Sequence, residues 1–455
     1  MNDRDIYDAI TDLDYALVKE SDNMYKMWRG RFRARVLWTA LLVTVILGIG
    51  ITGALESVQG TSLAAKAYAV AQPEYPEQTQ LGEQGYADNL NAFYAASMGQ
   101  ILSGTEGENR VYSPLNLYMT LAMLAETTGG ESRQQILDLL NQESMGDLRK
   151  QANMLWQANY RQDDRMKSVL ASSLWMNKDI EYDDHVLDIL AEAYYASSYQ
   201  GEMGSGRFTK AFQSWLNAQT GGLLGEQAAE LELPEDTVMA LATTLYYKAK
   251  WSKEFDPKDT KPGVFHGANG DVERDFMYQQ LIDLYVEEEN FSAVRQSMQD
   301  AGQSAMWYIL PGEGVSVDDL LADPEGLAFA SDPEGATEKL DQYLIDLAVP
   351  KLDVVFSRDL SEDLKVLGIT AVFSRENADF SALTETEPVW LSKVQHDVRL
   401  VVDEEGVEAS AYTAVIMLGG AGPSDRVKFV LDRPFLFVIT GLDGQPLFAG
   451  VVNQP

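Results

Sequence analysis

The fold is decided by one stretch of the sequence, Asp403 to Phe429, which reads DEEGVEASAYTAVIMLGGAGPSDRVKF. More than twenty residues of mostly small or apolar type lie here between two segments that have the pattern of strands. The stretch is too long for an ordinary core strand and too apolar for an ordinary surface loop. If the stretch became a strand, its residues would divide between two faces.

Successive side chains of a strand point to opposite faces, so residue types must alternate by two where one face is buried. Counting from Gly406, one face would carry only small or uncharged residues, namely Val407, Ala409, Ala411, Thr413, Val415 and Met417. The opposite face would carry Glu408, Ser410, Tyr412, Ala414, Ile416 and Leu418, which include the only charge. This pattern predicts a strand with one buried side.

The composition limits the classes of protein to consider. The chain has 455 residues, 45% of them hydrophobic, and can therefore bury a large core. Its net charge of -35 would repel a phosphate backbone, which argues against nucleic acid as a partner. It has no cysteine, so disulfides, thiolate nucleophiles and Cys-ligated zinc are excluded.

The N-terminal part predicts a membrane anchor. Val36 to Leu55 contains no charge, and twenty helical residues span roughly 30 Å, the thickness of a bilayer's hydrocarbon core. Basic residues crowd the segment before it, whereas Glu56 is the first charge after it, so the N-terminus is expected in the cytoplasm. A cleaved signal peptide is the alternative, although its apolar core is usually shorter. The expected order is a cytoplasmic tail (1–35), a transmembrane anchor (36–55), an extracellular linker (56–85) and one domain (86–455).

Within residues 86–455 the first half has helical periodicity and the second half has strand periodicity. Leu115, Met119, Ala122 and Met123 recur at helical spacing. Strands are predicted at Thr243–Trp251, Ala305–Pro311, Tyr343–Leu352 and Arg433–Val452, the last as a hairpin around Leu-Asp-Gly-Gln. This segregation of helices and strands indicates an α+β fold.

No constellation in the sequence points to catalysis. The three histidines, His185, His266 and His396, are far apart, and the known hydrolase, zinc, phosphate-loop and calcium-loop patterns are missing. Adjacent acidic pairs in so acidic a chain read as solvated surface. The sequence therefore predicts that the protein is not an enzyme, with no cofactor and no metal.

Three long segments resemble the serpins, a family of serine protease inhibitors. They are Asn109–Leu140, with its Ser-Pro helix start, Thr243–Gln279, with its K-x-K-W and F-D-P elements, and Ala348–Ala411. RPFLFVI and the closing LFAGVVNQP extend the resemblance over about 370 residues in the family's order. The resemblance implies a serpin-like α+β fold with three β-sheets, about eight or nine helices and an exposed reactive-centre loop, preceded here by the transmembrane helix.

In serpins the segment after E-E-G is a bait loop that a protease cleaves and that then inserts into the central sheet. The resemblance assigns the hinge of this loop to Glu405, Gly406, Val407, Glu408, Ala409, Ser410 and Ala411. It implies a scissile bond near Gly420 and Ala421, with Met417, Leu418 and Gly419 as alternatives. Val407 and Tyr412 stand where the family usually has Thr and Ala, and both are expected to be tolerated.

The resemblance also implies a group of residues that governs opening of the sheet. His396 matches the serpin histidine beneath the sheet, and Ser113 and Asn116 match its helix partners. Thr243 stands where many serpins have Asn, which puts the usual hydrogen-bond network in doubt. Trp251 matches the tryptophan at the top of the sheet.

The resulting hypothesis is an outward-facing, single-pass membrane protein that inhibits serine proteases by a covalent acyl-enzyme complex, with bacterial origin expected from the anchor, the acidity and the missing cysteines. The targets expected are elastase-like, subtilisin-like or chymotrypsin-like. A relic serpin that no longer inserts its loop, a non-inhibitory binding module and a cell-surface protease sensor are the alternatives.

Overall fold

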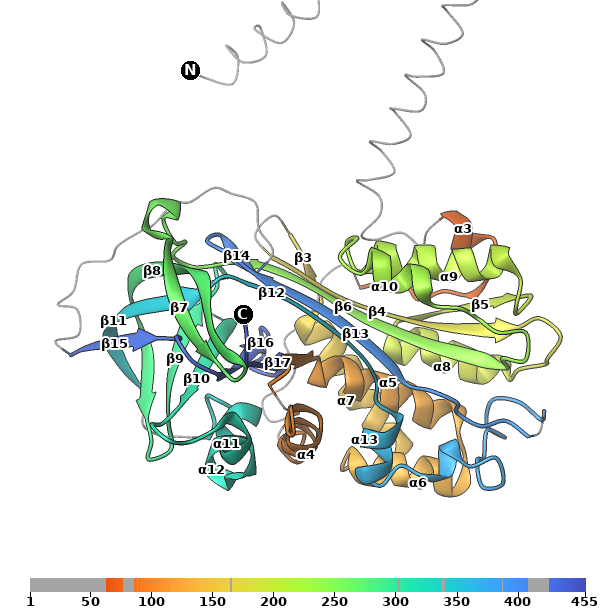
Figure 1. Cartoon of the computed structure of the whole chain (residues 1–455). Helices are drawn as coiled ribbons and strands as arrows, with labels where there is room; N and C mark the ends of the chain where they lie inside the picture. The colour runs from red at the N-terminus through yellow and green to blue at the C-terminus, as the bar shows by residue number, and fades with distance from the viewer. Residues whose placement is uncertain are drawn as a thin grey trace, which may run out of the picture. The chain divides into compact units, whose positions relative to one another are not determined.

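Two hydrogen-bonded sheets and the helices packed on them make up the described part of this computed structural model (Figure 1). The structure describes residues 63–76, 86–87, 89–105, 107–163, 166–300, 303–336, 340–386, 388–407 and 425–455. All of these residues belong to one unit, Gly60–Pro455.

The first sheet is the one that the Asp403–Phe429 stretch enters. Its strands, in spatial order, are β1 (Ala69–Ala71), β5 (Ala196–Gly201), β4 (Met166–Asn177), β6 (Met239–Lys250), β14 (Gly406–Val407), β13 (Gln395–Val402) and β12 (Leu352–Asp359), with β3 (Arg161–Gln162) paired to β4. Only β4 and β5 pair in parallel; the other pairs are antiparallel.

The contact between β6 and β13 is unusual, because these long strands are joined only through the two residues of β14. Ala249 and Lys250 of β6 pair with β14, and no ladder joins the other ten residues of β6, Met239–Lys248, to β13 in the described sheet. Figure 1 places β14 at one end of the sheet. The first sheet therefore has a seam that is filled only at that end.

The second sheet carries the chain after the stretch. Its strands, in spatial order, are β15 (Arg426–Val430), β11 (Asp341–Pro350), β8 (Gly270–Glu287), β9 (Phe291–Ser297), β10 (Ala305–Pro311), β16 (Phe435–Thr440), β17 (Pro446–Val452) and β2 (Arg110–Tyr112), with β7 (Lys261–Gly267) paired to β8. The predicted hairpin is confirmed as β16 and β17, and its turn uses Gly444 with a φ of 81°.

Eleven α-helices occur among the described residues, more than the eight or nine expected. They are α3 (Leu63–Lys66), α4 (Asn91–Leu102), α5 (Pro114–Thr127), α6 (Gly130–Leu139), α7 (Met145–Asn159), α8 (Asp184–Tyr194), α9 (Gly206–Gln219), α10 (Gly225–Glu230), α11 (Val317–Ala322), α12 (Pro324–Ser331) and α13 (Ser361–Val366). The larger number arises because four of them have six residues or fewer, too short for a periodicity to show in the sequence. Two 3-10 turns, Pro257–Asp259 and Ala371–Phe373, complete the elements.

The expectation of three sheets is also corrected, since two are found in the described chain. The reason is β8, whose eighteen residues pair with β7 and β11 along one part and with β9 along another, which joins two sheets into one. The predicted strand Tyr343–Leu352 is in fact divided. Its first part is β11 in the second sheet, and Leu352 begins β12 in the first.

Helices cover both faces of the first sheet. Figure 1 shows α9 and α10 on one face and α5, α7 and α8 on the other. A small apolar cluster lies under α9 and contains Trp175, Phe208 and Trp215, whereas the larger cluster fills the space between the helices of the other face and the second sheet. α5 starts at a Ser113 cap followed by Pro114, and twelve of its fourteen residues are buried, so it is the central helix of the larger cluster.

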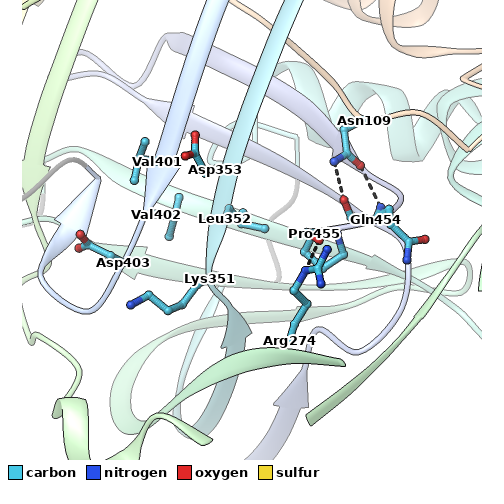
Figure 2. A pocket seen from close by; sticks show the side chains of 10 residues that line it. All are labelled: Asn109, Arg274, Lys351, Leu352, Asp353, Val401, Val402, Asp403, Gln454 and Pro455. Atoms are coloured by element: carbon cyan, nitrogen blue, oxygen red, sulfur yellow. Dashed lines mark hydrogen bonds between the residues drawn. The ribbon is translucent and has the colours of Figure 1, made fainter. Parts of the chain in front are cut away.

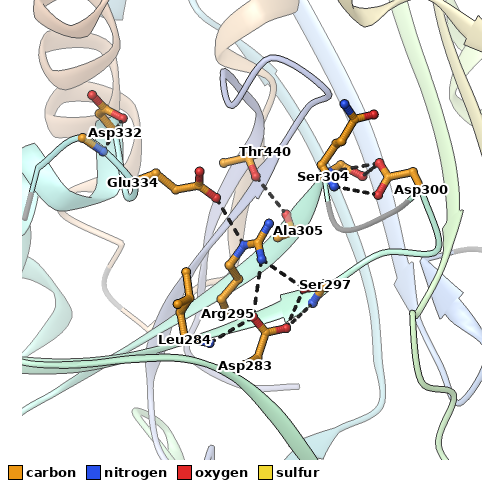
Figure 3. A network of polar contacts seen from close by, with 12 residues as sticks. Asp283, Leu284, Arg295, Ser297, Asp300, Ser304, Ala305, Asp332, Glu334 and Thr440 are labelled. Atoms are coloured by element: carbon orange, nitrogen blue, oxygen red, sulfur yellow. Dashed lines mark hydrogen bonds and ion pairs between the residues drawn. The ribbon is translucent and has the colours of Figure 1, made fainter. Parts of the chain in front are cut away.

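A polar network braces the second sheet (Figure 3). Asp283 on β8 accepts hydrogen bonds from the backbone N–H and the hydroxyl of Ser297 on β9, at 3.0 and 2.6 Å. Arg295 lies between Asp283 and Glu334, with N–O distances of 3.4 and 3.2 Å. Because Asp283 is largely buried, these partners compensate the loss of its hydration and fix β8 against β9.

The N-terminal segments differ from expectation where the structure describes them. Residues 63–76, part of the predicted linker, contain α3 and the strand β1, which pairs with β5. The linker composition concealed them because both are very short. The predicted span Val36–Leu55 lies outside the described residues, and no described helix is long and apolar enough to cross a membrane.

Candidate functional site

The predicted hinge begins in a tight turn between β13 and β14. The Asp403 carboxylate accepts hydrogen bonds from the backbone N–H groups of Glu405 and Gly406, at 3.0 and 3.2 Å. The Asp403 N–H in turn donates to the Gly406 carbonyl, at 3.0 Å. The turn therefore closes a hairpin from which β14 can only continue antiparallel to β13.

Trp251 and Phe255 hold this turn from the side of β6. The Trp251 indole N–H donates to the Asp403 carbonyl at 3.0 Å, and its backbone N–H donates to the Glu405 carbonyl, also at 3.0 Å. The Phe255 N–H donates to the Glu404 carbonyl at 2.9 Å. Trp251 is completely buried, so its ring also anchors this end of the sheet in the core.

Glu404 ties the same turn to the residues that immediately precede β12 and β7. Its carboxylate accepts from the Lys351 ammonium and from the Thr260 hydroxyl, both at 2.8 Å. Burial opposes its ionisation, yet these hydrogen bonds outweigh burial and lower the pKa of Glu404. Lys351 and Asp403 also line an open hollow of about 630 Å³ beside the turn, shown with its other lining residues in Figure 2.

β14 occupies the end of the seam between β6 and β13. Val407 faces Ala249 on one side and Val402 on the other, and it is 2% exposed. Gly406 lies so close to β6 that an added Cβ would be 2.1 Å from the Ala249 carbonyl oxygen. Only glycine fits this approach, which explains the residue at the start of the hinge.

Of the predicted sheet-opening residues, Trp251 lies at the hinge turn, whereas the other four meet at the start of α5. The Ser113 N–H donates to Nε2 of His396 at 3.2 Å, and the Ser113 hydroxyl accepts from the N–H of Asn116 at 3.1 Å. Burial lowers the pKa of His396 to about 4, although the nearby Asp397 acts in the opposite direction. His396 is therefore neutral at neutral pH and accepts a hydrogen bond at the start of α5.

Thr243 contacts this group through its backbone carbonyl and its hydroxyl, in place of the asparagine side chain found in many serpins. Its backbone carbonyl accepts from the Asn116 side-chain amide at 3.2 Å, and its hydroxyl lies 2.5 Å from the hydroxyl of Thr120. Sequence reasoning missed Thr120. Its spacing of four residues from Asn116 on a helix was the available signal, because such residues share a face.

The remainder of the predicted loop site lies outside the described residues. This applies to the hinge residues Glu408, Ala409, Ser410 and Ala411 and to the scissile-bond candidates Met417, Leu418, Gly419, Gly420 and Ala421. The chain is described again from Asp425, whose carbonyl accepts from the Leu344 N–H at 2.9 Å. Arg426 then forms two hydrogen bonds with Asp346, at 2.6 and 2.9 Å, which fasten β15 to β11.

The three histidines lie apart in the described structure. His396 on β13 accepts a hydrogen bond from the Ser113 backbone N–H, whereas His185 and His266 lie on α8 and β7. Among the residues that the structure describes, no group of three or more His, Asp or Glu side chains is arranged to hold a metal ion. The described contacts of the site are hydrogen bonds of the hinge turn and of the start of α5.

The model of one protein family, "Serpin (serine protease inhibitor)", matches residues 88–455. The chain belongs to the serpin family. Among curated relatives, Serpin-ZX of Arabidopsis thaliana is 28% identical over 373 residues, which cover 78% of this chain and 94% of the relative. Alpha-1-antiproteinase of Rattus norvegicus is 27% identical over 386 residues, covering 81% and 89%. Members of this family are protease inhibitors rather than catalytic enzymes.

Solved structures show the same fold. The native state of tengpin, a thermophilic serpin, has a TM-score of 0.74 at 23% identity and covers 86% of this chain and 99% of its own. A human thyroxine-binding globulin complex has a TM-score of 0.70 at 21% identity and covers 82% and 100%. The serpin fold predicted from the sequence is thus confirmed.

The close approach of Gly406 to β6 gives a first prediction. Replacing Gly406 by Ala should expel β14 from the seam, because the new methyl group would overlap the Ala249 carbonyl. Hydrogen exchange of the 403–407 backbone should become at least tenfold faster. Gly206→Ala is the matched control, since an added Cβ there meets nothing within 4 Å. Equal exchange in the two variants would contradict this account.

The buried His396 gives a second prediction, for pH. Its folded pKa of about 4 lies below the ordinary value of 6.5, so the unfolded chain binds more protons between these values. The free energy of unfolding should therefore fall by about 3 kcal/mol as pH drops from 6.5 to 4. In His396→Gln, which keeps an acceptor but does not titrate, this part of the pH dependence should disappear. The measurement is the free energy of unfolding of both proteins, from chemical denaturation across this pH range. The same pH dependence in both would contradict the assignment of this effect to His396.

Proposed function

We propose that the protein is a suicide-substrate inhibitor of serine endopeptidases, which traps the acyl-enzyme by inserting its cleaved reactive loop into the first sheet. The observation that carries this proposal is the seam between β6 and β13, where β14 already fills one end and the remainder has no strand among the described residues. Family membership supports the inhibitory function, and the seam supports the mechanism.

Continuing the register of β14 shows what insertion would bring together. Val407 pairs with Val402 and with Ala249, so in an antiparallel strand Ala409 would come to lie between Leu400 and Tyr247. Both neighbours are at least 96% buried. The small and uncharged face of the loop is therefore the face that this seam could accept without burying a charge.

In the same continued register Thr413 would come to lie between Thr243 and His396. These are the residues that meet α5 beneath the sheet. A threonine hydroxyl at this level could exchange hydrogen bonds with a neutral His396, and a charged residue could not be accommodated. The sheet-opening group would thus serve first the closed sheet and then the inserted strand.

The length of β6 limits where the loop can be cut. In the continued register Met417 would lie opposite Met239, the last residue of β6 that the strand would reach. A strand from Gly406 to Met417 would extend roughly 40 Å at about 3.3 Å per residue. A bond cut at or beyond Met417 leaves enough chain to fill the seam, which supports the candidate range of Met417 to Ala421.

The chemical steps follow from ordinary serine protease chemistry. The protease serine Oγ attacks the carbonyl of the scissile bond, the amine leaves with the C-terminal fragment, and an ester joins the two proteins. Insertion then moves this ester by tens of ångströms and pulls it out of the oxyanion hole. Water can no longer complete hydrolysis, so the complex persists.

The residue types of the loop limit the class of protease. No Lys or Arg occurs between Arg399 and Arg426, so a trypsin-like pocket, which needs a cation, would find no suitable side chain. Elastase-like, subtilisin-like and chymotrypsin-like enzymes accept small or apolar residues such as those from Met417 to Ala421.

A binding or sensing function is the alternative. The fold is shared with thyroxine-binding globulin, which was solved as a complex with thyroxine, and the 35 residues before the predicted anchor could relay a cleavage signal. The buried Val407 favours inhibition, because a hinge that has already entered the seam needs only to extend.

The proposed location is the outer surface of a cell membrane, with Val36–Leu55 as a single-pass anchor and the N-terminus in the cytoplasm. Bacterial origin stays a prediction.

The decisive experiment mixes a chain beginning at Gly60 with elastase-like and subtilisin-like proteases. We expect a complex that survives boiling in SDS, together with a released C-terminal fragment whose first residue identifies the bond. Clean cleavage without a complex would contradict inhibition and favour the sensor.

A pair of variants separates insertion from cleavage. Ala409→Arg should abolish the SDS-stable complex and be cleaved as a substrate, because its charge would be buried between Leu400 and Tyr247. Glu408→Gln, its neighbour on the opposite face, should retain the complex. A persistent complex with Ala409→Arg would refute the proposed register.

A further inference from the structure

The segment 63–76 precedes the residues that the family model matches, yet it is docked along the first sheet. It begins on α9, where Ala65 of α3 is completely buried in the small apolar cluster. Tyr68 then contacts Phe208 of α9 edge to face, with 5.0 Å between ring centroids. The start of the segment is thus fixed to the helix that lies across the sheet.

The segment next adds a strand to the sheet. In β1, Ala69 and Ala71 pair with Tyr199 and Ser198 of β5. The Gln200 N–H donates to the carbonyl of Tyr68 at 2.9 Å. β1 thereby covers the outer edge of β5, whose backbone groups would otherwise be free to pair with another chain.

Tyr75 ends the docked segment on an aromatic surface formed by Trp156, Tyr160 and Tyr195, here called the aromatic socket. Its ring is nearly parallel to all three, with centroid distances of 5.7, 5.9 and 6.1 Å. The socket rings also stack on one another, at 4.3 Å for Trp156 with Tyr160 and 3.8 Å for Trp156 with Tyr195. Tyr75 remains 45% exposed, so it lies on the socket as a ligand would, rather than inside the core.

Only Gln72, Pro73 and Glu74 connect β1 to Tyr75. Pro73 has a fixed φ, so this connection has little slack. One short extended peptide therefore contacts both the β5 edge and the aromatic socket. Backbone pairing provides affinity, and the aromatic residue provides specificity, as in other cases of strand addition.

We propose that the β5 edge and the aromatic socket form a peptide-binding site, filled in cis by residues 68–75, whose occupancy holds the first sheet closed against insertion of the reactive loop. The control of insertion rests on the proposed function, because it requires that the loop can insert. The peptide-binding site depends only on the docked segment.

The mechanical reason lies in the elements that the segment joins. A strand added between β6 and β13 must separate them by about 4.8 Å. The strands β5, β4 and β6 must then shift relative to the helices beneath them. The segment is bound to β5 and α9 at one end and to the socket at the other, where Trp156 and Tyr160 lie at the end of α7 and Tyr195 follows α8. With so short a connection, such a shift must break either β1 pairing or the Tyr75 contact.

The socket is itself linked to the sheet. The Trp156 indole N–H donates to the carbonyl of Leu170 on β4 at 3.1 Å. Tyr75 covers the Trp156–Tyr160–Tyr195 stack and so favours the position of Trp156 that makes this bond. Loss of Tyr75 should loosen the contact between α7 and β4 as well as the segment.

The test uses the full chain and two variants of the segment. Tyr75→Ala removes the aromatic ligand, and Val70→Ala is the matched control, because Val70 is a 51% exposed residue of β1. Hydrogen exchange of the Gln200 N–H should be roughly tenfold faster in Tyr75→Ala and unchanged in Val70→Ala. Spontaneous conversion of the uncleaved chain to a form with a higher melting temperature should accelerate by a similar factor in Tyr75→Ala alone.

A synthetic peptide of residues 63–76 completes the test. Added to Tyr75→Ala, it should slow exchange and conversion toward the unmodified rates, whereas the same peptide with Tyr75→Ala should have no effect. These readouts involve no protease, so a failure to form a protease complex does not decide them. Equal exchange in both variants, or no effect of the peptide, would overturn the binding site. Faster exchange without faster conversion would overturn its control of insertion.

Discussion

The organisation of the described chain depends on one seam, which lies between β6 and β13. β6 and β13 lie in one sheet, but in the described chain only the two residues of β14 join them, and ten residues of β6 have no ladder on that side. In the continued register the added strand would pair with ten residues of β6 and with the seven residues Gln395–Val401 of β13. At about 1 kcal/mol net for each backbone hydrogen bond, this pairing would stabilise the sheet by roughly 10 kcal/mol or more. In the proposed mechanism, insertion of the loop would release this difference in free energy.

The surrounding structure keeps the loop at this starting position. Trp251, Phe255 and Lys351 fix the turn that precedes β14, while Gly406 allows the chain to pass against β6. The neutral His396 joins β13 to α5 beneath the seam. At the other end of the loop β15 is held to β11. In the proposed mechanism these contacts would position the first step of insertion and oppose the later ones.

The α+β class and the hairpin of β16 and β17 could be predicted from the sequence, because they depend on periodicity and turn residues. The hinge assignment rests on the resemblance to serpins, and only Glu405, Gly406 and Val407 of it lie among the described residues. The contact of Thr243 with α5 could not be predicted, since its backbone carbonyl replaces an expected side chain. The union of two sheets by β8 depends on strand pairing, which a single sequence does not encode locally. The docked segment was missed because its helix and strand have four and three residues.

Insertion of the loop between β6 and β13 is tested most directly by a melting temperature. It is measured on the chain beginning at Gly60, before and after cleavage between Met417 and Ala421. The account predicts a rise of tens of degrees, because the released loop would complete the sheet on both sides. An unchanged or lower melting temperature after clean cleavage at this site would show that the seam does not accept the loop and would contradict the central claim.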